Sequence, residues 1–213
     1  MECPFCEEFV NPSSFKDIVP EWPYPDRIIA NNGGAMAFPG LGPIVPKTPY
    51  ILVVPKRCST SFLDTDHEDK RSMLDLIDRL VQIDSLFPCG QALVFEHGGI
   101  TGNSGCKCID HCHLHLMNIA GPWVRLPEVL SEYHHDGEAV MNAEMSNEKS
   151  AYLFAGYYRI GNRSFKGRMA RIKGCREPQF FRALIGRMTD NQFDYRRREN
   201  VATMIDTYEK AKK

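Results

Sequence analysis

The chain has 213 residues, of which 43% are hydrophobic, and a formal net charge of −1, as expected for a globular protein. No run of 18 apolar residues is present to span a membrane. The opening MECPFCEEFV lacks the basic start and apolar stretch of a signal peptide. We therefore expect a cytoplasmic protein whose 8 cysteines are reduced ligands or small buried residues.

The small net charge hides an uneven distribution. Residues 151–213 contain 15 Lys and Arg against 6 Asp and Glu, whereas residues 1–150 carry a net charge of −10. Such a basic segment is consistent with a polyanionic substrate, an acidic partner or attraction between the two parts. It also contains enough aromatic and aliphatic residues to fold, so a nucleic-acid-binding arm is not expected.

Turn signals and apolar periodicity divide the first half of the chain into strands and one helix. The sequence 31–34, Asn-Asn-Gly-Gly, predicts a hairpin turn, and 12–26 reads as a proline-punctuated loop. A helix is predicted to begin after Asp64 or Asp66 and to reach about Phe87, with one apolar face. Five segments read as strands: 27–30, 35–38, 50–54, 91–95 and 111–119.

Pro122 and Pro127 mark the end of this core. Four further elements are predicted after it, two strands and two helices: 151–158, 166–172, 178–188 and 199–211. The order of elements implies an α+β fold, in which an antiparallel sheet packs against the long helix. We predict a first domain at 1–122 and an α/β C-terminal extension at 123–213 that packs on it.

Three of the 7 histidines lie in the segment 109–118, IDHCHLHLMN. On a strand His111, His113 and His115 would line one face at intervals of about 6 to 7 Å, with the apolar residues between them on the other. On a helix the rings would diverge. A row of imidazoles suits an anion that must be both held and attacked, since one ring can be a neutral nucleophile while its neighbours donate hydrogen bonds. A chance cluster or a surface metal site is the alternative.

The segment HCHLHLM resembles the His-x-His-x-His-x-x signature of the histidine triad (HIT) family, where x is usually apolar. Residues 37–57 resemble the family's first hairpin, and the likeness covers about residues 3–120. Residues 93–111 further resemble galactose-1-phosphate uridylyltransferase and longer diadenosine-polyphosphate-hydrolase-like members. The resemblance implies a HIT-like antiparallel sheet and a homodimer, since family members usually pair through the sheet and helix.

The resemblance also implies cleavage at the α-phosphate of a nucleotide or dinucleoside polyphosphate-like substrate. His113 would attack and form a phosphohistidine that water resolves, while His115 would donate to a non-bridging oxygen. Uridylyltransferases carry Gln at the third histidine position, so His115 favours hydrolysis. A nucleotidyltransferase and a non-catalytic HIT-fold binding module are the alternatives.

Substrate contacts are expected on both sides of the scissile bond. Phe38 matches the aromatic residue that packs on the base in family members, and Leu41 lies close to it in sequence. Gly40 stands where nucleotide-binding members commonly place an Asp against the ribose. Residues expected to hold the phosphate lie in the glycine-containing loop 102–108: Asn103, Ser104 and Lys107.

Cys3-Pro4-Phe5-Cys6 is either a redox pair or half of a zinc site. A redox pair needs a preceding strand, for which the two residues before Cys3 leave no room. In zinc-bearing HIT proteins the third ligand comes directly after the first hairpin, and the fourth is the first histidine of the triad. The corresponding residues here are Cys58 and His111. The resemblance thus implies one structural Zn²⁺ held by Cys3, Cys6, Cys58 and His111. Ordinary buried thiols, or a site that has lost its metal, are the alternative. The second ring nitrogen of His111 would face the active site.

The remaining cysteines and histidines have weaker interpretations. His97, at a predicted strand end, is ambiguous and could approach the site, whereas His134 and His135 are expected to be exposed at a helix end. Three cysteines are expected to be packed small residues and not a second metal site: Cys106, Cys108 and Cys112.

Arginines of the extension are predicted either to bind the substrate beyond the scissile phosphate or to pair with the acidic body. Residues 193–196, Phe-Asp-Tyr-Arg, resemble an Asp-Trp-Arg element that closes the equivalent region in longer bacterial HIT members. Five arginines are candidates: Arg182, Arg187, Arg196, Arg197 and Arg198.

Overall fold

The computed structural model describes residues 3–99, 109, 111–133, 137–145, 151–172, 179–190 and 198–213, without the side chains of residues 133, 198 and 199. It contains six α-helices: α1 (Pro4–Val10), α2 (Phe15–Ile18), α3 (His67–Val81), α4 (Leu126–Tyr133), α5 (Phe180–Met188) and α6 (Arg198–Lys212). Eight strands accompany them: β1 (Ala30–Asn31), β2 (Ala35–Pro39), β3 (Tyr50–Pro55), β4 (Gln91–Gly98), β5 (Leu114–Met117), β6 (Gly137–Asn142), β7 (Tyr152–Arg159) and β8 (Ser164–Arg171). No helix in these ranges is long and apolar enough to cross a bilayer.

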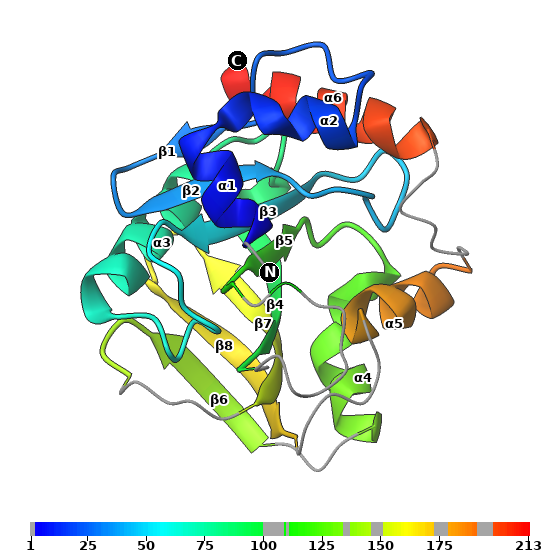
Figure 1. Ribbon diagram of the computed structural model, residues 1–213. Coiled ribbons are helices and arrows are strands. Elements are labelled where there is room, and N and C mark those ends of the chain that lie inside the picture. The colour runs from blue at the N-terminus through cyan, green and yellow to red at the C-terminus, as the bar shows by residue number, and fades with distance from the viewer. Residues whose placement is uncertain are drawn as a thin grey trace.

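The eight strands form one antiparallel sheet in the order β1-β2-β3-β5-β4-β7-β8-β6 (Figure 1). β5 lies between β3 and β4, so that Leu52, His115 and Phe95 stand side by side across three strands. Side chains alternate between the two faces of a strand. Residues such as Val53 and Leu114 therefore pack against α3 in one core cluster, and the opposite face carries His115. The α+β fold predicted from the sequence, an antiparallel sheet with a packed long helix, is confirmed.

The long helix starts where the sequence predicts and ends earlier. The Asp66 side chain caps α3 by accepting a hydrogen bond from the main-chain N–H of Asp69. The helix stops at Val81, although the prediction extended it to Phe87. The chain turns after Val81, where the N–H of Phe87 donates to the carbonyl of Ile83. Phe87 is completely buried in the core after this turn.

The histidine-bearing strand is shorter than predicted. β5 begins at Leu114, so His111 and His113 precede it, although the prediction placed both within a strand at 111–119. The chain bends at His111, and the N–H of Cys112 donates to the carbonyl of Ser59 outside the ladder. The alternation nevertheless continues through this segment, because Cys112 and Leu114 both lie in the core cluster on the α3 side.

The three strands of the extension belong to the same sheet as the first half. β7 pairs with β4 along its whole length, from Gln91↔Arg159 to Gly98↔Tyr152, and β8 and β6 follow at the edge. The predicted strands at 151–158 and 166–172 and the helices at 178–188 and 199–211 are confirmed within two residues at each end. The prediction missed α1, α2, α4 and β6; α2 lies within residues 12–26, which were predicted to be a loop. Of the strand predicted at 27–30, only Ala30 belongs to β1. The division at residue 122 and the homodimer stay predictions.

A buried ion pair ties α1 and α2 to the sheet. Nε and Nη2 of Arg27 lie 2.6 and 2.7 Å from the two carboxylate oxygens of Glu8, and Nη1 donates to the carbonyl of Pro39 at 2.9 Å. The guanidinium lies between the rings of Phe15 and Phe38, at 4.2 and 4.1 Å from their centroids. Arg27 and Glu8 are only 4% and 5% exposed, so the pair replaces the hydration of both charges.

Replacing Arg27 with alanine is expected to lower the free energy of unfolding by about 3 to 5 kcal/mol, because the Glu8 carboxylate would remain buried without its partner. Urea denaturation measures the change. Arg71→Ala is the matched control: its pair with Glu144 is more than half exposed on both sides and contributes about 1 kcal/mol or less. Equal effects of the two substitutions would contradict this prediction.

Candidate active site

Four predicted metal ligands meet at the start of α1: Cys3, Cys6, Cys58 and His111, called here the metal cluster. Their ligand atoms all lie within 4.8 Å of one another, and Nδ1 of His111 is 3.2 Å from Sγ of Cys3 and 3.6 Å from Sγ of Cys6. In a tetrahedral zinc site, neighbouring ligand atoms are roughly 3.5 to 3.8 Å apart. The geometry therefore permits the four residues to bind one metal ion.

A hydrogen bond determines which nitrogen of His111 faces the cysteines. Nε2 lies 2.8 Å from the carbonyl oxygen of Pro55, at the end of β3. A carbonyl can only accept, so Nε2 carries the proton and Nδ1 keeps a lone pair for a cation. The prediction that the second ring nitrogen of His111 faces the active site is therefore wrong. His111 reaches that site through its main-chain carbonyl instead.

The charges of the metal cluster also favour a cation. Burial first, and then the hydrogen bond and charge of Cys3, raise the pKa of the Cys6 thiol to about 12; Cys58 acts in the same direction. Thiolates this close repel one another, and a bound divalent ion removes the repulsion and holds them deprotonated. Three sulfurs with one imidazole are a donor set of closed structural zinc sites.

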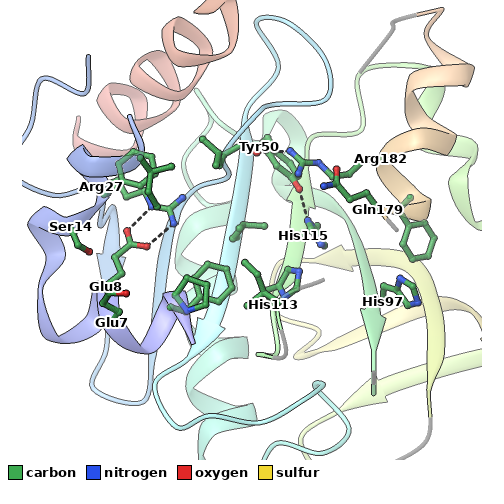
Figure 2. A pocket seen from close by; sticks show the side chains of 18 of the residues that line it. Glu7, Glu8, Ser14, Arg27, Tyr50, His97, His113, His115, Gln179 and Arg182 are labelled. Carbon is green, nitrogen blue, oxygen red and sulfur yellow. Dashed lines mark hydrogen bonds and ion pairs between the residues drawn. The ribbon is translucent and has the colours of Figure 1, made fainter. Parts of the chain in front are cut away.

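A cavity of about 380 Å³ lies on the other side of the histidine segment. The sheet forms its floor, α1 and α2 form one wall, and residues of α5 form the opposite wall (Figure 2). His113 and His115 both line it. Glu7 and Asp17 line the wall of α1 and α2 together with the Glu8–Arg27 ion pair, whose charges offset each other, whereas Arg182 lines the wall of α5. The cavity therefore has an acidic end and an end where imidazoles and a guanidinium gather.

His113 is held in the tautomer that a nucleophile requires. Its Nδ1 lies 2.6 Å from the carbonyl oxygen of His111 and must donate to it, which leaves the lone pair on Nε2. Burial lowers the pKa of His113 to about 4, and the charges of His111 and Arg182 act in the same direction. The ring is therefore neutral near pH 7, and Nε2 can form a bond to an electrophile.

His115 is positioned as a hydrogen-bond donor. Its ring stacks on Phe95 with the centroids 4.6 Å apart and lies 4.8 Å from the ring of His113. The Tyr50 hydroxyl is 2.5 Å from Nδ1 of His115. Burial raises the pKa of Tyr50, so the hydroxyl stays protonated and can donate to Nδ1 of His115. Burial also holds the pKa of His115 well below its usual range. When Tyr50 donates, the single proton of this neutral ring is on Nε2, where it can be donated to a ligand.

His97 is the third histidine that lines the cavity, after His113 and His115. It lies on β4 two residues after Phe95, which pairs with His115. Nε2 of His97 is buried and has no hydrogen-bond partner among the residues that the structure describes. Burial, and then the charge of His113, lower the pKa of His97 to about 4. A buried nitrogen without a partner is available to hydrogen-bond a ligand.

Arg182 brings a positive charge from α5 to the site. Its Nη2 donates to the carbonyls of Leu41 and Gly42, and its Cζ lies 5.5 Å from the Tyr50 ring centroid. Its charge lowers the pKa of both His113 and His115. Of the other candidate arginines, Arg187 is exposed and does not line the cavity. Arg196, Arg197 and the side chain of Arg198 lie outside the described residues.

Of the two residues predicted to contact the nucleoside, one lines the cavity and the other does not. Leu41 lines the cavity. Phe38 is fully buried and does not line it, so its contact with a base stays a prediction.

Cys112 is buried in the core cluster as expected, and its Sγ donates to Glu96. Seven residues with predicted roles or positions lie outside the described part of the chain: Asn103, Ser104, Lys107, Cys106, Cys108, His134 and His135.

No protein-family model matches the sequence, and no curated protein matches it. The solved structures that match this chain include histidine triad nucleotide-binding proteins. A hypothetical histidine triad nucleotide-binding protein from Sulfolobus tokodaii is 20% identical, with a TM-score of 0.34; the alignment covers 54% of this chain and 66% of that one.

Two further solved structures cover more of the chain. A DUF4931 family protein from Bacillus cereus is 10% identical over 87% of this chain and 100% of that one, with a TM-score of 0.40. A galt-like protein from Arabidopsis thaliana is 9% identical over 81% and 83%, with a TM-score of 0.42. What the site does is therefore inferred from its own geometry.

Proposed function

We propose that the chain is a nucleotide hydrolase that cleaves at the α-phosphate of a nucleotide or dinucleoside polyphosphate-like substrate through a phosphohistidine on His113. The supporting observation is the hydrogen bond from Nδ1 of His113 to the carbonyl of His111, which leaves the lone pair on Nε2. His115 and Arg182 line the same cavity and offer a hydrogen bond and a positive charge to phosphoryl oxygens.

The reaction would proceed in two displacements. Nε2 of His113 attacks the α-phosphorus, a P–N bond forms, and the bond from phosphorus to the leaving-group oxygen breaks with its electron pair on that oxygen. The N–H of His115 and the charge of Arg182 stabilise the negative charge on the phosphoryl oxygens. Water then attacks the same phosphorus, a P–O bond forms and the P–N bond breaks; Nε2 regains its lone pair, and the proton from water is released to solvent.

We further propose that the metal cluster holds one structural Zn²⁺. The ion would neutralise the cysteine thiolates and fix His111. The His111 carbonyl would in turn hold the ring of His113, so the contribution of the cluster to catalysis is to position the nucleophile.

Intact-mass spectrometry of the full chain tests the covalent step. The protein is mixed briefly with a panel of mono- and dinucleotides and quenched without acid, because a phosphohistidine is acid-labile. A nucleotidyl adduct on wild type that is absent from His113→Ala would support the proposal. Product formed in ¹⁸O-labelled water should carry the label on its phosphate. Release of the adduct only when a sugar phosphate is added would indicate a transferase, and no adduct with any nucleotide would leave only a binding module.

Removing the Tyr50 hydroxyl is expected to slow turnover without unfolding the protein. In Tyr50→Phe the ring still fills its place, but Nδ1 of His115 loses its donor and the tautomer is no longer fixed. Loss of one such hydrogen bond corresponds to a decrease in kcat of about tenfold to a hundredfold. The Michaelis constant should change much less, because Tyr50 acts through His115. Steady-state kinetics separate the two parameters, and an unchanged kcat would contradict this positioning role.

A further inference from the structure

The surface of Phe38 is already covered within the protein. The guanidinium of Arg27 lies 4.1 Å from the Phe38 centroid, and the Phe5 ring packs at 5.4 Å. Phe38 has no exposed surface. Arg27 is held in place by both carboxylate oxygens of Glu8 and by the carbonyl of Pro39. A planar group can therefore stack on Phe38 only if a buried ion pair is broken.

A carboxylate at position 40 is excluded as well. A Cβ atom added to Gly40 would lie 2.3 Å from Cε1 of Tyr50. The Tyr50 ring cannot move away freely, because its hydroxyl is bonded to His115 and Arg182 lies over its face. Tyr50 thus occupies the space into which a side chain at residue 40 would extend. The place expected to bind a ribose diol contains an aromatic ring instead.

The open space lies between the helices, next to the histidines. Four apolar side chains from the two walls line it: Phe15 and Ile18 from α2, and Phe180 and Phe181 from α5. Leu41, which lies shortly after β2, lines it as well. Ile18 is 59% exposed, so this wall is accessible. Glu7 and Asp17 line the cavity at the end formed by α1 and α2, and Figure 2 shows Glu7 on α1, on the side away from Arg182. Two carboxylates at an apolar wall repel an anionic group and accept a neutral or cationic one.

We infer that the organic group of the phosphorylated substrate binds between the wall of α1 and α2 and the wall of α5, and that this group is planar or apolar and carries no negative charge. The inference rests on the proposed function for the position of the phosphoryl group at His113. It adds that Phe38 and residue 40 do not recognise the nucleoside. Specificity then comes from helices outside the central sheet.

Calorimetric titration of the zinc-loaded full chain tests the charge selectivity. Phenyl phosphate and 4-carboxyphenyl phosphate have the same ring and phosphate and differ by one negative charge. The carboxylated probe should bind about tenfold more weakly, because it is repelled by Glu7 and Asp17. Asp17→Lys should reverse or remove this preference. Asp84→Lys is the matched control, since Asp84 is an exposed acid that does not line the cavity, and it should leave the preference unchanged.

A second comparison tests the position of the organic group. Ile18→Ser should weaken phenyl phosphate binding about fivefold or more through lost apolar contact, whereas 2′,3′-dideoxy-AMP should bind within about threefold of AMP because no buried carboxylate contacts the diol. Equal affinities for the two phenyl probes, or a loss above about tenfold for the dideoxy nucleotide, would overturn the inference. These are binding measurements, so a missing covalent adduct would contradict the proposed function and leave this result intact.

Discussion

Replacing His113 with alanine is expected to lower turnover at least about a thousandfold, because a missing covalent nucleophile removes the first step of the proposed reaction. The fold should survive. His113 lines the cavity, while Cys112 and Leu114 on either side of it remain packed against α3. Single-turnover kinetics with the best substrate of the panel, together with a circular dichroism spectrum, measure both effects.

His67→Ala is the control for this experiment. His67 lies at the start of α3, where it contacts Glu144 on the surface, so its loss should leave the rate unchanged. If His113→Ala kept more than about a tenth of wild-type activity, His113 would not be the nucleophile. His97 is then the next candidate, since its buried Nε2 has no partner among the described residues.

Replacing Cys58 with serine is expected to release the metal and to destabilise the protein. A ligand that binds only the folded state at a thousand times its Kd contributes about 4 kcal/mol, and a stability loss of that order should follow. Elemental analysis should find about one zinc per wild-type chain and much less in the variant. Wild type treated with a chelator should show a similar decrease in Tm.

Cys89→Ser distinguishes loss of metal from loss of any cysteine. Cys89 is also exposed, but it lies before β4 and outside the metal cluster. Zinc content and Tm should therefore not change in this variant. Wild-type protein purified without chelator and free of zinc would contradict the metal assignment.

Local patterns predicted the parts of the fold that local forces determine. Asp66 precedes a run with one apolar face, so the start of α3 could be predicted from capping alone. Alternation predicted the faces of Cys112, His113 and Leu114 correctly, although hydrogen-bonded strand pairing begins only at Leu114. The ligands of the metal cluster came from the family resemblance, and the structure brings them together.

Contacts between distant residues could not be predicted in the same way. Tyr50 read as an ordinary strand residue, and its role depends on a hydrogen bond to His115, 65 positions away. Arg27 covers Phe38 because Glu8 holds it, and no spacing in the sequence signals that arrangement. The end of α3 was missed because the apolar residues up to Phe87 continue the helical pattern, whereas the chain turns after Val81.

Helix α1 has two roles that are physically coupled. It contributes Cys6 to the metal cluster and follows directly on Cys3, and it contributes Phe5 and Glu7 to the wall of the cavity. An ion that holds α1 in place therefore also reduces the conformational freedom that a substrate would otherwise have to remove. Thermodynamic linkage makes this coupling reciprocal: by whatever factor zinc tightens substrate binding, bound substrate must tighten zinc binding by the same factor. An ion that takes no part in the chemistry would thus act as an effector of the site, and its rate of loss to a chelator would report on substrate occupancy.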